Sequence, residues 1–335
     1  MADATVEQQT GGPAQRRPFG VLRGLARMRE LSILLVLIAV AIYFSVTTSA
    51  FNSIENYHTI VQFFAPWAII GVGEVMLLIC GEIDLSAGFV FTLSPFTLMV
   101  FYNNGVPLIL SIILSIVISA FIGVVNGFIR TRFNLPSFIV TLGMSFLIEG
   151  ISLIVSNGSP VSAPNTGAVV AIFGKARWSE LIWVLAVVVL MQVVLSATRF
   201  GVYTQATGSN PVGAAESGIR ANRVKIVNFA VCSTLAGIGG IVDGLRVGSF
   251  DPTNGGANTM FLAVASAVIG GTALLGGSGT VVGALIGAAL LGTVFDGFNL
   301  TGVSANAFDV VLGIAILVAM LLNVYLSILR RRASR

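Results

Sequence analysis

The stretch LSILLVLIAVAIYFSVTTSA, residues 31–50, has no charged side chain. A helix rises about 1.5 Å per residue, so about 20 apolar residues cross a hydrocarbon layer about 30 Å thick. The stretch therefore predicts a membrane-spanning helix, and it is too long for the apolar core of a cleaved signal. The residues before it contain five arginines, at positions 16, 17, 23, 27 and 29. We expect residues 1–30 to form an uncleaved tail in the cytoplasm.

The same apolar character extends over the whole chain. Hydrophobic residues make up 56% of the 335 residues and charged residues only 10%, and the mean hydropathy is +0.95. A soluble domain has about a quarter of its residues charged. The composition therefore predicts an all-α, polytopic membrane bundle of about ten transmembrane helices. The expected spans are residues 31–50, 59–80, 85–103, 106–129, 136–155, 180–198, 225–246, 259–275, 278–297 and 306–328.

The basic residues predict how the bundle is oriented. With ten spans, fifteen of the eighteen lysines and arginines fall on one side, and only Lys175, Arg177 and Arg246 fall on the other. Because basic residues gather in cytoplasmic segments, both termini are expected in the cytoplasm. The transmembrane domain would then be residues 31–329, followed by a cytoplasmic tail at 330–335. The net charge of +4 reflects this orientation and does not indicate nucleic-acid binding.

Few residues in the chain suit catalysis. His58 is the single histidine, so the sequence offers neither a histidine-rich metal site nor a Ser/His/Asp set. The stretch GGSGT, residues 276–280, lacks the lysine of a phosphate-binding loop. We therefore expect a protein that is not an enzyme and holds no cofactor or metal. Transport would need an ion gradient sensed by buried carboxylates, or a partner that touches the cytoplasmic surface.

The segment 199–224 interrupts the apolar sequence with small, polar and basic residues. Asn210 is a good N-cap, Pro211 suits the first helical position and Gly218 suits a left-handed residue that ends a helix. These signals predict a short helix over residues 211–217. Its body, PVGAAES, has almost no side chain to bury. It suits either a knob that docks into a groove on another protein or an ordinary loop with a helical turn.

Five ordered segments resemble one family. The residues concerned are Asn210, Ala214, Ser217, Gly218 and Ile219 in the short helix, with GEIDLSAG at 81–88, LPSFIVTLGM at 135–144, VIGGTALLGGSGTVVGALIGAALLG at 268–292 and NLTGVSANAFDVVLGIAILVA at 299–319. They are similar to the inner-membrane permease subunits of ATP-binding-cassette (ABC) importers, in the ribose-type family that also serves xylose and galactose. The chain departs from that pattern at Glu82, where the family commonly has glycine, and at Met260 and Phe261, where it often has Glu-Leu.

The resemblance implies an importer that moves a small polar solute, most often a monosaccharide, into a bacterial cell. Its implied partners are two ATPase subunits that bind ATP and magnesium, a second permease that is identical or different, a periplasmic or lipid-tethered solute-binding protein, and membrane lipid. The short helix would contact the ATPases. The residues assigned to this contact are Asn210, Pro211, Gly213, Ala214, Ala215, Glu216, Ser217, Gly218 and Ile219.

Polar residues inside the expected spans are candidates for the solute pathway, because an unpaired charge there costs about 2.5–3.5 kcal/mol. The charged and hydroxyl-bearing candidates are Asp84, Ser86, Thr141 and Asp243, and the aromatic Phe138 joins them because it begins the span at 136–155 together with Thr141. Plain packing is the alternative for Phe138 and Thr141. Asp84 is expected to cap the start of a broken helix, with solute contact as the alternative. Asp243 lies three residues before Arg246, so an ion pair and a solute contact are both open.

Other interpretations remain at this point. Within the importer class, the chain could serve nucleosides or branched-chain amino acids. A transporter driven by an ion gradient could instead use Glu74, Asp84 or Asp309. Glu149 and Asp296 are further carboxylates expected in spans. The segments IGVVNGF at 122–128 and LGTVFDGF at 291–298 faintly resemble each other, which leaves an internal repeat open.

Overall fold

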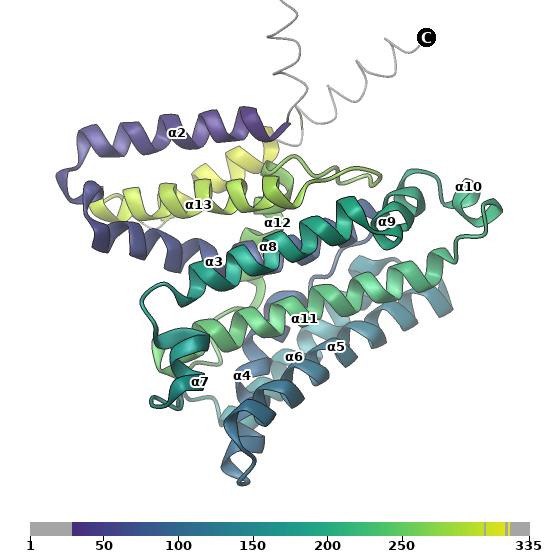
Figure 1. Ribbon diagram of the computed structural model, residues 1–335, viewed down its shortest axis with the longest axis horizontal. Helices are drawn as coiled ribbons and strands as arrows, with labels where there is room; N and C mark the ends of the chain where they lie inside the picture. The colour runs from purple at the N-terminus through teal and green to yellow at the C-terminus, as the bar shows by residue number, and fades with distance from the viewer. Residues whose placement is uncertain (1–28, 305, 319–320, 322–335) are drawn as a thin grey trace, which may run out of the picture.

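The computed structural model describes residues 29–304, 306–318 and 321, and this part of the chain is an almost wholly helical bundle (Figure 1). Seven helices in it are long and apolar enough to cross a membrane, and three apolar helices are shorter. The long ones are α2 (Arg29–Thr47), α3 (Ile54–Ile79), α5 (Leu108–Phe133), α6 (Ser137–Ser156), α8 (Ser179–Ala197), α11 (Ala221–Val247) and α13 (Val281–Thr301). The shorter ones are α4 (Ala87–Asn103), α12 (Gly256–Ile269) and the helix Asn306–Val318. The all-α membrane fold is confirmed.

In the described part of the chain a helix lies at each of the ten expected spans, seven of them long enough to cross a membrane, with differences at their ends. α3 starts at Ile54, five residues early, because the hydroxyl of Ser53 accepts the Asn56 N–H and caps it. α12 ends at Ile269, six residues early, because Gly271 has a φ of +90° and the chain turns away. The predicted tails at 1–30 and 330–335 and the end of the last span lie almost entirely outside the described residues.

The remaining elements are short. They are the 3₁₀ helix η1 (Ser49–Asn52), α7 (Ala168–Val170), the π-helix η2 (Ala171–Lys175), α9 (Arg199–Ser209) and α10 (Pro211–Glu216). β1 (Val161–Ser162) and β2 (Ser249–Phe250) pair antiparallel. We call the end of the bundle that carries α9 and α10 the α10 end; α7 lies at the opposite end of the long helices (Figure 1).

Two helix triplets repeat the same pattern. Each has a long, a short and a long helix: α3, α4 and α5, then α11, α12 and α13. α5 packs on α11, where Gly123 and Gly127 lie against the α11 backbone, and α13 packs on α3, where Gly292 lies against Phe64. These glycines belong to the two similar segments. α3 and α11 run antiparallel, since Lys225 near the start of α11 contacts Glu82 just after the end of α3. The packing therefore supports an inverted repeat of the kind found in transporters.

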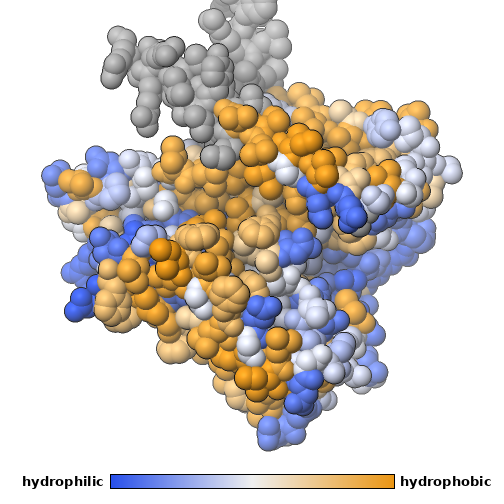
Figure 2. Space-filling view, turned by 180° about the vertical axis from the view of Figure 1, so that it is seen from behind, coloured by the Kyte–Doolittle hydropathy of each residue, from blue (hydrophilic) through white to orange (hydrophobic). Residues whose placement is uncertain are grey.

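Burial separates central from peripheral helices. In the most apolar 18-residue stretch of α3, 78% of the residues are buried, whereas the buried share is 28% in the corresponding stretch of α6 and 6% in that of α2. The exposed faces of the peripheral helices are apolar, as at Phe121, with 64% of its surface exposed, and Phe146, with 68%. Figure 2 shows apolar side chains over the middle of one face and hydrophilic ones toward its edges. Such a surface suits lipid or a second membrane subunit.

Candidate functional site: a protruding helix, a central break and a groove

The predicted short helix is present as α10, which protrudes beyond α9 and the start of α11 (Figure 1). The Asn210 side chain accepts the Gly213 N–H at 3.0 Å, and Pro211 occupies the first turn. After the helix, Gly218 has a φ of +81°, and the Ile219 N–H donates to the Ala214 carbonyl at 2.9 Å. The caps at both ends are therefore confirmed, and the helix ends at Glu216, one residue earlier than expected.

α10 presents a surface that its own chain does not cover. Ala214 is its one buried residue, and Pro211, Ala215, Glu216 and Ser217 are exposed. Val212 has 68% of its surface exposed. α10 is thus a short helix of mostly small residues that is capped at both ends and has no core of its own.

α9 was not predicted, and it fastens α10 to the bundle. Its helix begins after Thr198, whose hydroxyl accepts the Gly201 N–H at 3.3 Å. A Cβ atom at Gly208 would overlap the Ile79 carbonyl, so α9 lies directly on the end of α3. Its sequence, RFGVYTQATGS, is rich in weak helix formers, which is why propensity did not reveal it. The Thr198 N-cap was the available signal. The expected coupling loop at 199–224 therefore consists largely of two helices.

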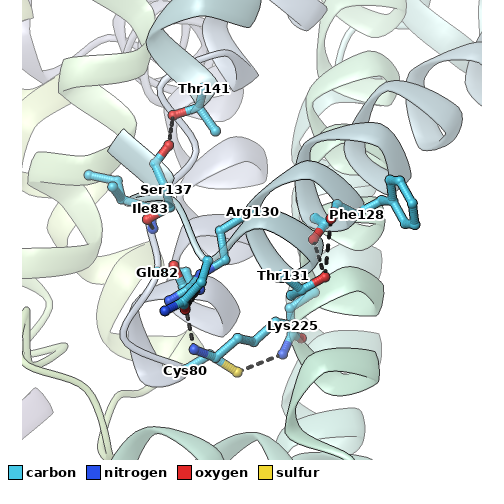
Figure 3. Close-up of polar contacts among 12 residues, drawn as sticks. Cys80, Glu82, Ile83, Phe128, Arg130, Thr131, Ser137, Thr141 and Lys225 are labelled. Atoms are coloured by element: carbon cyan, nitrogen blue, oxygen red, sulfur yellow. Dashed lines mark hydrogen bonds and ion pairs between the residues drawn. The ribbon is translucent and has the colours of Figure 1, made fainter. Parts of the chain in front are cut away.

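Glu82 joins three elements at the α10 end (Figure 3). Its side chain is buried in the connection between α3 and α4, and its Oε1 accepts from Arg130 Nε at 2.7 Å and from Lys225 Nζ at 2.6 Å. Arg130 lies near the end of α5 and Lys225 near the start of α11. The carboxylate thus ties the ends of both helices to the α3–α4 connection. The sequence marked Glu82 as a departure from the family pattern but did not show its partners.

Asp84 holds the turn that precedes α4, whose N-cap residue is Ser86. Its Oδ1 accepts the Ser86 N–H at 2.9 Å and the Ser86 hydroxyl at 2.6 Å, and its Oδ2 accepts the Ser233 hydroxyl at 3.2 Å. Asn126 Nδ2 donates to Ser86 Oγ at 2.8 Å and to Asp84 Oδ1 at 3.4 Å. The network ties the start of α4 to α5 and α11. Glu74 lies beside it, also fully buried, and accepts the Asp84 N–H at 3.5 Å.

Thr141 belongs to the same region, whereas Phe138 does not. The Thr141 hydroxyl accepts the Leu85 N–H at 3.0 Å and donates to the Ser137 carbonyl at 2.9 Å, and Ser137 Oγ accepts the Ile83 N–H (Figure 3). Phe138 points outward with 52% of its surface exposed. The pathway candidates therefore separate: Asp84, Ser86 and Thr141 hold the α3–α4 break in place, and Phe138 faces away from it.

Asp243, the fifth candidate, lies in an ion network at the opposite end. Its Oδ1 pairs with Arg246 Nη2 at 2.6 Å, and its Oδ2 accepts from Asn254 Nδ2 at 2.8 Å. Arg246 Nε also lies 3.2 Å from Glu180 Oε1. The ion pair is thus present, and Asp243 also lines a recess of about 510 Å³ together with Trp67. In the described part of the chain, no three histidine, cysteine or acidic residues are grouped to hold a metal.

A groove of about 470 Å³ lies between α4, α6, α12 and the segment before α12. Its polar lining residues are Thr92, Ser145, Glu149, Ser152 and Thr253, and its aromatic ones are Phe89, Phe146 and Phe261. Sequence reasoning missed this set, because the elements that form it are far apart in the chain. The spacing of Ser145, Glu149 and Ser152, four and then three residues, was the available signal for one polar face on α6.

An apolar helical bundle with two similar helix triplets, a break between α3 and α4 and a short helix that protrudes from one end is typical of a membrane transport protein. The chain belongs to the family described as branched-chain amino acid transport system / permease component, whose model matches residues 56–320. It is therefore a multi-pass membrane permease of the kind that serves ABC importers.

Curated relatives agree with this family and narrow its type. The chain is 39% identical to the xylose/arabinose import permease protein XylH of Sulfolobus acidocaldarius, over 90% of this chain and 86% of the relative. It is 34% identical to the ribose import permease protein RbsC of Escherichia coli K12, over 89% of this chain and 94% of the relative. It is 27% identical to the autoinducer 2 import system permease protein LsrC of Photorhabdus luminescens, over 90% of this chain and 92% of the relative. No solved structure matches. The resemblance to ribose-type sugar permeases is confirmed.

Proposed function

We propose that this chain is the membrane subunit of an ABC importer that carries a monosaccharide into the cytoplasm, powered by two separate ATPase subunits that bind ATP and magnesium. The observation that carries the proposal is α10, a capped helix at the end of the bundle with Val212 exposed over 68% of its surface. The names of the xylose/arabinose and ribose relatives support a sugar as the solute.

The structure offers a route from α10 to the bundle. Four residues separate the end of α10 from α11, which starts at Ala221, and α9 rests on the end of α3 at Gly208. A displacement of α10 by closing ATPases would therefore move the ends of α3 and α11. Such coupling requires that ATPase closure favours one state of the bundle, outward-open or inward-open, over the other.

The proposal also implies how the bundle is oriented in the membrane and which further partners it has. The α10 end and both termini would face the cytoplasm of a bacterial cell. The end that carries β1 and β2 would bind a periplasmic or lipid-tethered binding protein. A second permease, identical or different, would cover the exposed apolar face of α6 that lies outside the groove, where Leu147 and Ile154 have 56% and 77% of their surfaces exposed. Lipid would cover the rest.

Two other functions have a specific observation in their favour. The family description names branched-chain amino acids, which supports a solute other than sugar within the same importer class. The adjacent, fully buried carboxylates of Glu74 and Asp84 would suit a proton- or sodium-driven transporter. The importer is preferred over an ion-driven transporter because buried carboxylates do not explain a protruding helix with both ends capped. A sugar is preferred as the solute because the names of the xylose/arabinose and ribose relatives point to one.

Cross-linking tests the ATPase contact directly. The Val212→Cys variant, labelled with a thiol-reactive photocross-linker, should form an adduct with the ATPase subunit in the assembled complex. Val247→Cys is the matched control, because Val247 is exposed over 54% of its surface at the opposite end. Both native cysteines are buried, so the background should be low. Equal yields from the two variants, or no adduct from Val212→Cys, would contradict the proposal.

A further inference from the structure

Glu149 places a carboxylate in the middle of a membrane-spanning helix. It lies twelve residues after Ser137, the first residue of α6, which corresponds to about 18 Å along the helix. Its side chain is exposed, and within the described residues no ion pair or hydrogen bond involves it. A charged group at this depth is strongly disfavoured in lipid and usually faces a water-filled cavity. The face of α6 that carries Glu149 therefore borders water.

That face is the wall of the groove. Ser145, Glu149 and Ser152 line it from α6, and Thr92 of α4 lines it from another side. The volume of about 470 Å³ lies in the range of small-molecule sites and exceeds what one monosaccharide needs. The groove is thus a space within the membrane that is polar on one wall and large enough for a solute.

The available polar atoms of the α6 wall are hydrogen-bond acceptors. Ser145 and Ser152 are nearly buried, with 3% and 1% of their surfaces exposed, and they donate their hydroxyl hydrogens to the carbonyls of Thr141 and Ile148, so only their oxygens could accept. The Glu149 carboxylate can only accept. Among the described residues that line the groove there is no lysine or arginine. Such a surface suits a neutral solute with several hydroxyl donors and repels an anion.

Aromatic side chains complete the groove. Phe89, Phe146 and Phe261 lie among its lining residues, and Phe146 and Phe261 have 68% and 56% of their surfaces exposed. An aromatic ring packs well against the C–H face of a sugar ring, while the hydroxyl groups at the sugar's edge reach polar partners. The combination of rings with one carboxylate matches a polyhydroxylated ring better than an aliphatic amino acid.

We propose that Glu149 determines specificity along the solute path, by accepting hydrogen bonds from the hydroxyl groups of a neutral sugar and excluding anionic solutes from the groove. This inference rests on the proposed importer function and names the residue that would recognise the solute inside the membrane. Glu149 acts by direct contact with the solute. Ser145 and Ser152 supply further acceptors on the same wall.

Thiol labelling tests the charge of the groove without transport. Leu153→Cys places a thiol on the groove wall, and Ile154→Cys is the matched control, because Ile154 is more exposed but does not line the groove. A cationic methanethiosulfonate should label Leu153→Cys at least about tenfold faster than an anionic one, and Ile154→Cys should react slowly with both. Adding Glu149→Gln should remove most of the preference. Equal labelling rates with the cationic and the anionic reagent in Leu153→Cys with Glu149 intact would overturn the inference.

Transport by the assembled complex tests specificity. With D-ribose or D-xylose delivered by the binding protein, Glu149→Gln should lower kcat/KM about tenfold or more, because a charged acceptor is lost. Glu149→Asp keeps the charge and should retain most of the sugar uptake. If the wild-type complex imports no sugar, the proposed function fails. If it imports sugar and Glu149→Gln matches it in uptake and labelling, the present inference fails and the function stands.

Discussion

Gly218 offers a test in which backbone conformation is separated from packing. Its φ of +81° is unfavourable for residues with a side chain, and a Cβ atom there would meet nothing within 4 Å. Gly218→Ala and Gly218→Val therefore disturb only the left-handed turn that ends α10, at a cost of about 1–2 kcal/mol. That cost changes a conformational equilibrium by a factor of about 5–30. α10 buries only Ala214, so little else holds its cap in place.

The assay is solute-stimulated ATP hydrolysis by the complete complex in proteoliposomes. Stimulation should fall several-fold in Gly218→Ala and further in Gly218→Val, with membrane insertion unchanged. Gly105→Val is the matched control, because Gly105 has a φ of +85°, equally open surroundings and a position between α4 and α5 at the opposite end. Wild-type stimulation in both Gly218 variants would refute the reasoning that the α10 cap takes part in coupling.

Three further substitutions test the contacts that surround α10 and the break. Glu82→Gln should lower the unfolding temperature of the purified complex, and a double-mutant cycle with Lys225→Met should give an interaction energy of about 0.5–3 kcal/mol; additive effects would count against the ion-pair cluster. Asp84→Asn keeps an oxygen for the cap, so assembly should survive, whereas Asp84→Ala strands buried donors at about 1–3 kcal/mol each and should reduce the yield of folded protein; equal yields would contradict the capping role. Gly208→Ala should weaken both thermal stability and coupling because its methyl group meets the Ile79 carbonyl, and normal values for both would show that α9 tolerates displacement.

Local signals in the sequence predicted the spans and α10 well. A span depends on about twenty consecutive apolar residues, and the caps of α10 depend on Asn210, Pro211 and Gly218, which lie within nine residues. Asp84 was predicted as a cap for the same reason, since its main partner, Ser86, is two residues away. These features are fixed by neighbours along the chain, so a single sequence contains them.

The groove and the Glu82 cluster could not be predicted in this way. Glu82 meets Lys225 across 143 positions of the sequence, and the groove joins α4, α6 and α12. Such contacts depend on how the helices pack, and the packing depends on glycines such as Gly123 that lie against another backbone. Phe138 shows that a local signal can also mislead. Its position among polar residues at the start of a helix suggested that it lines the solute pathway, but its side chain points outward.

We propose that this permease is powered through partner subunits and does not use an ion gradient of its own. Uptake of labelled D-ribose or D-xylose by proteoliposomes, with and without the ATPase subunits and the binding protein, tests this proposal. We expect uptake only when both partners and ATP are present, and none when a proton or sodium gradient is imposed on vesicles that contain this chain alone. Gradient-driven uptake by the chain alone would contradict it and would direct attention to Glu74 and Asp84.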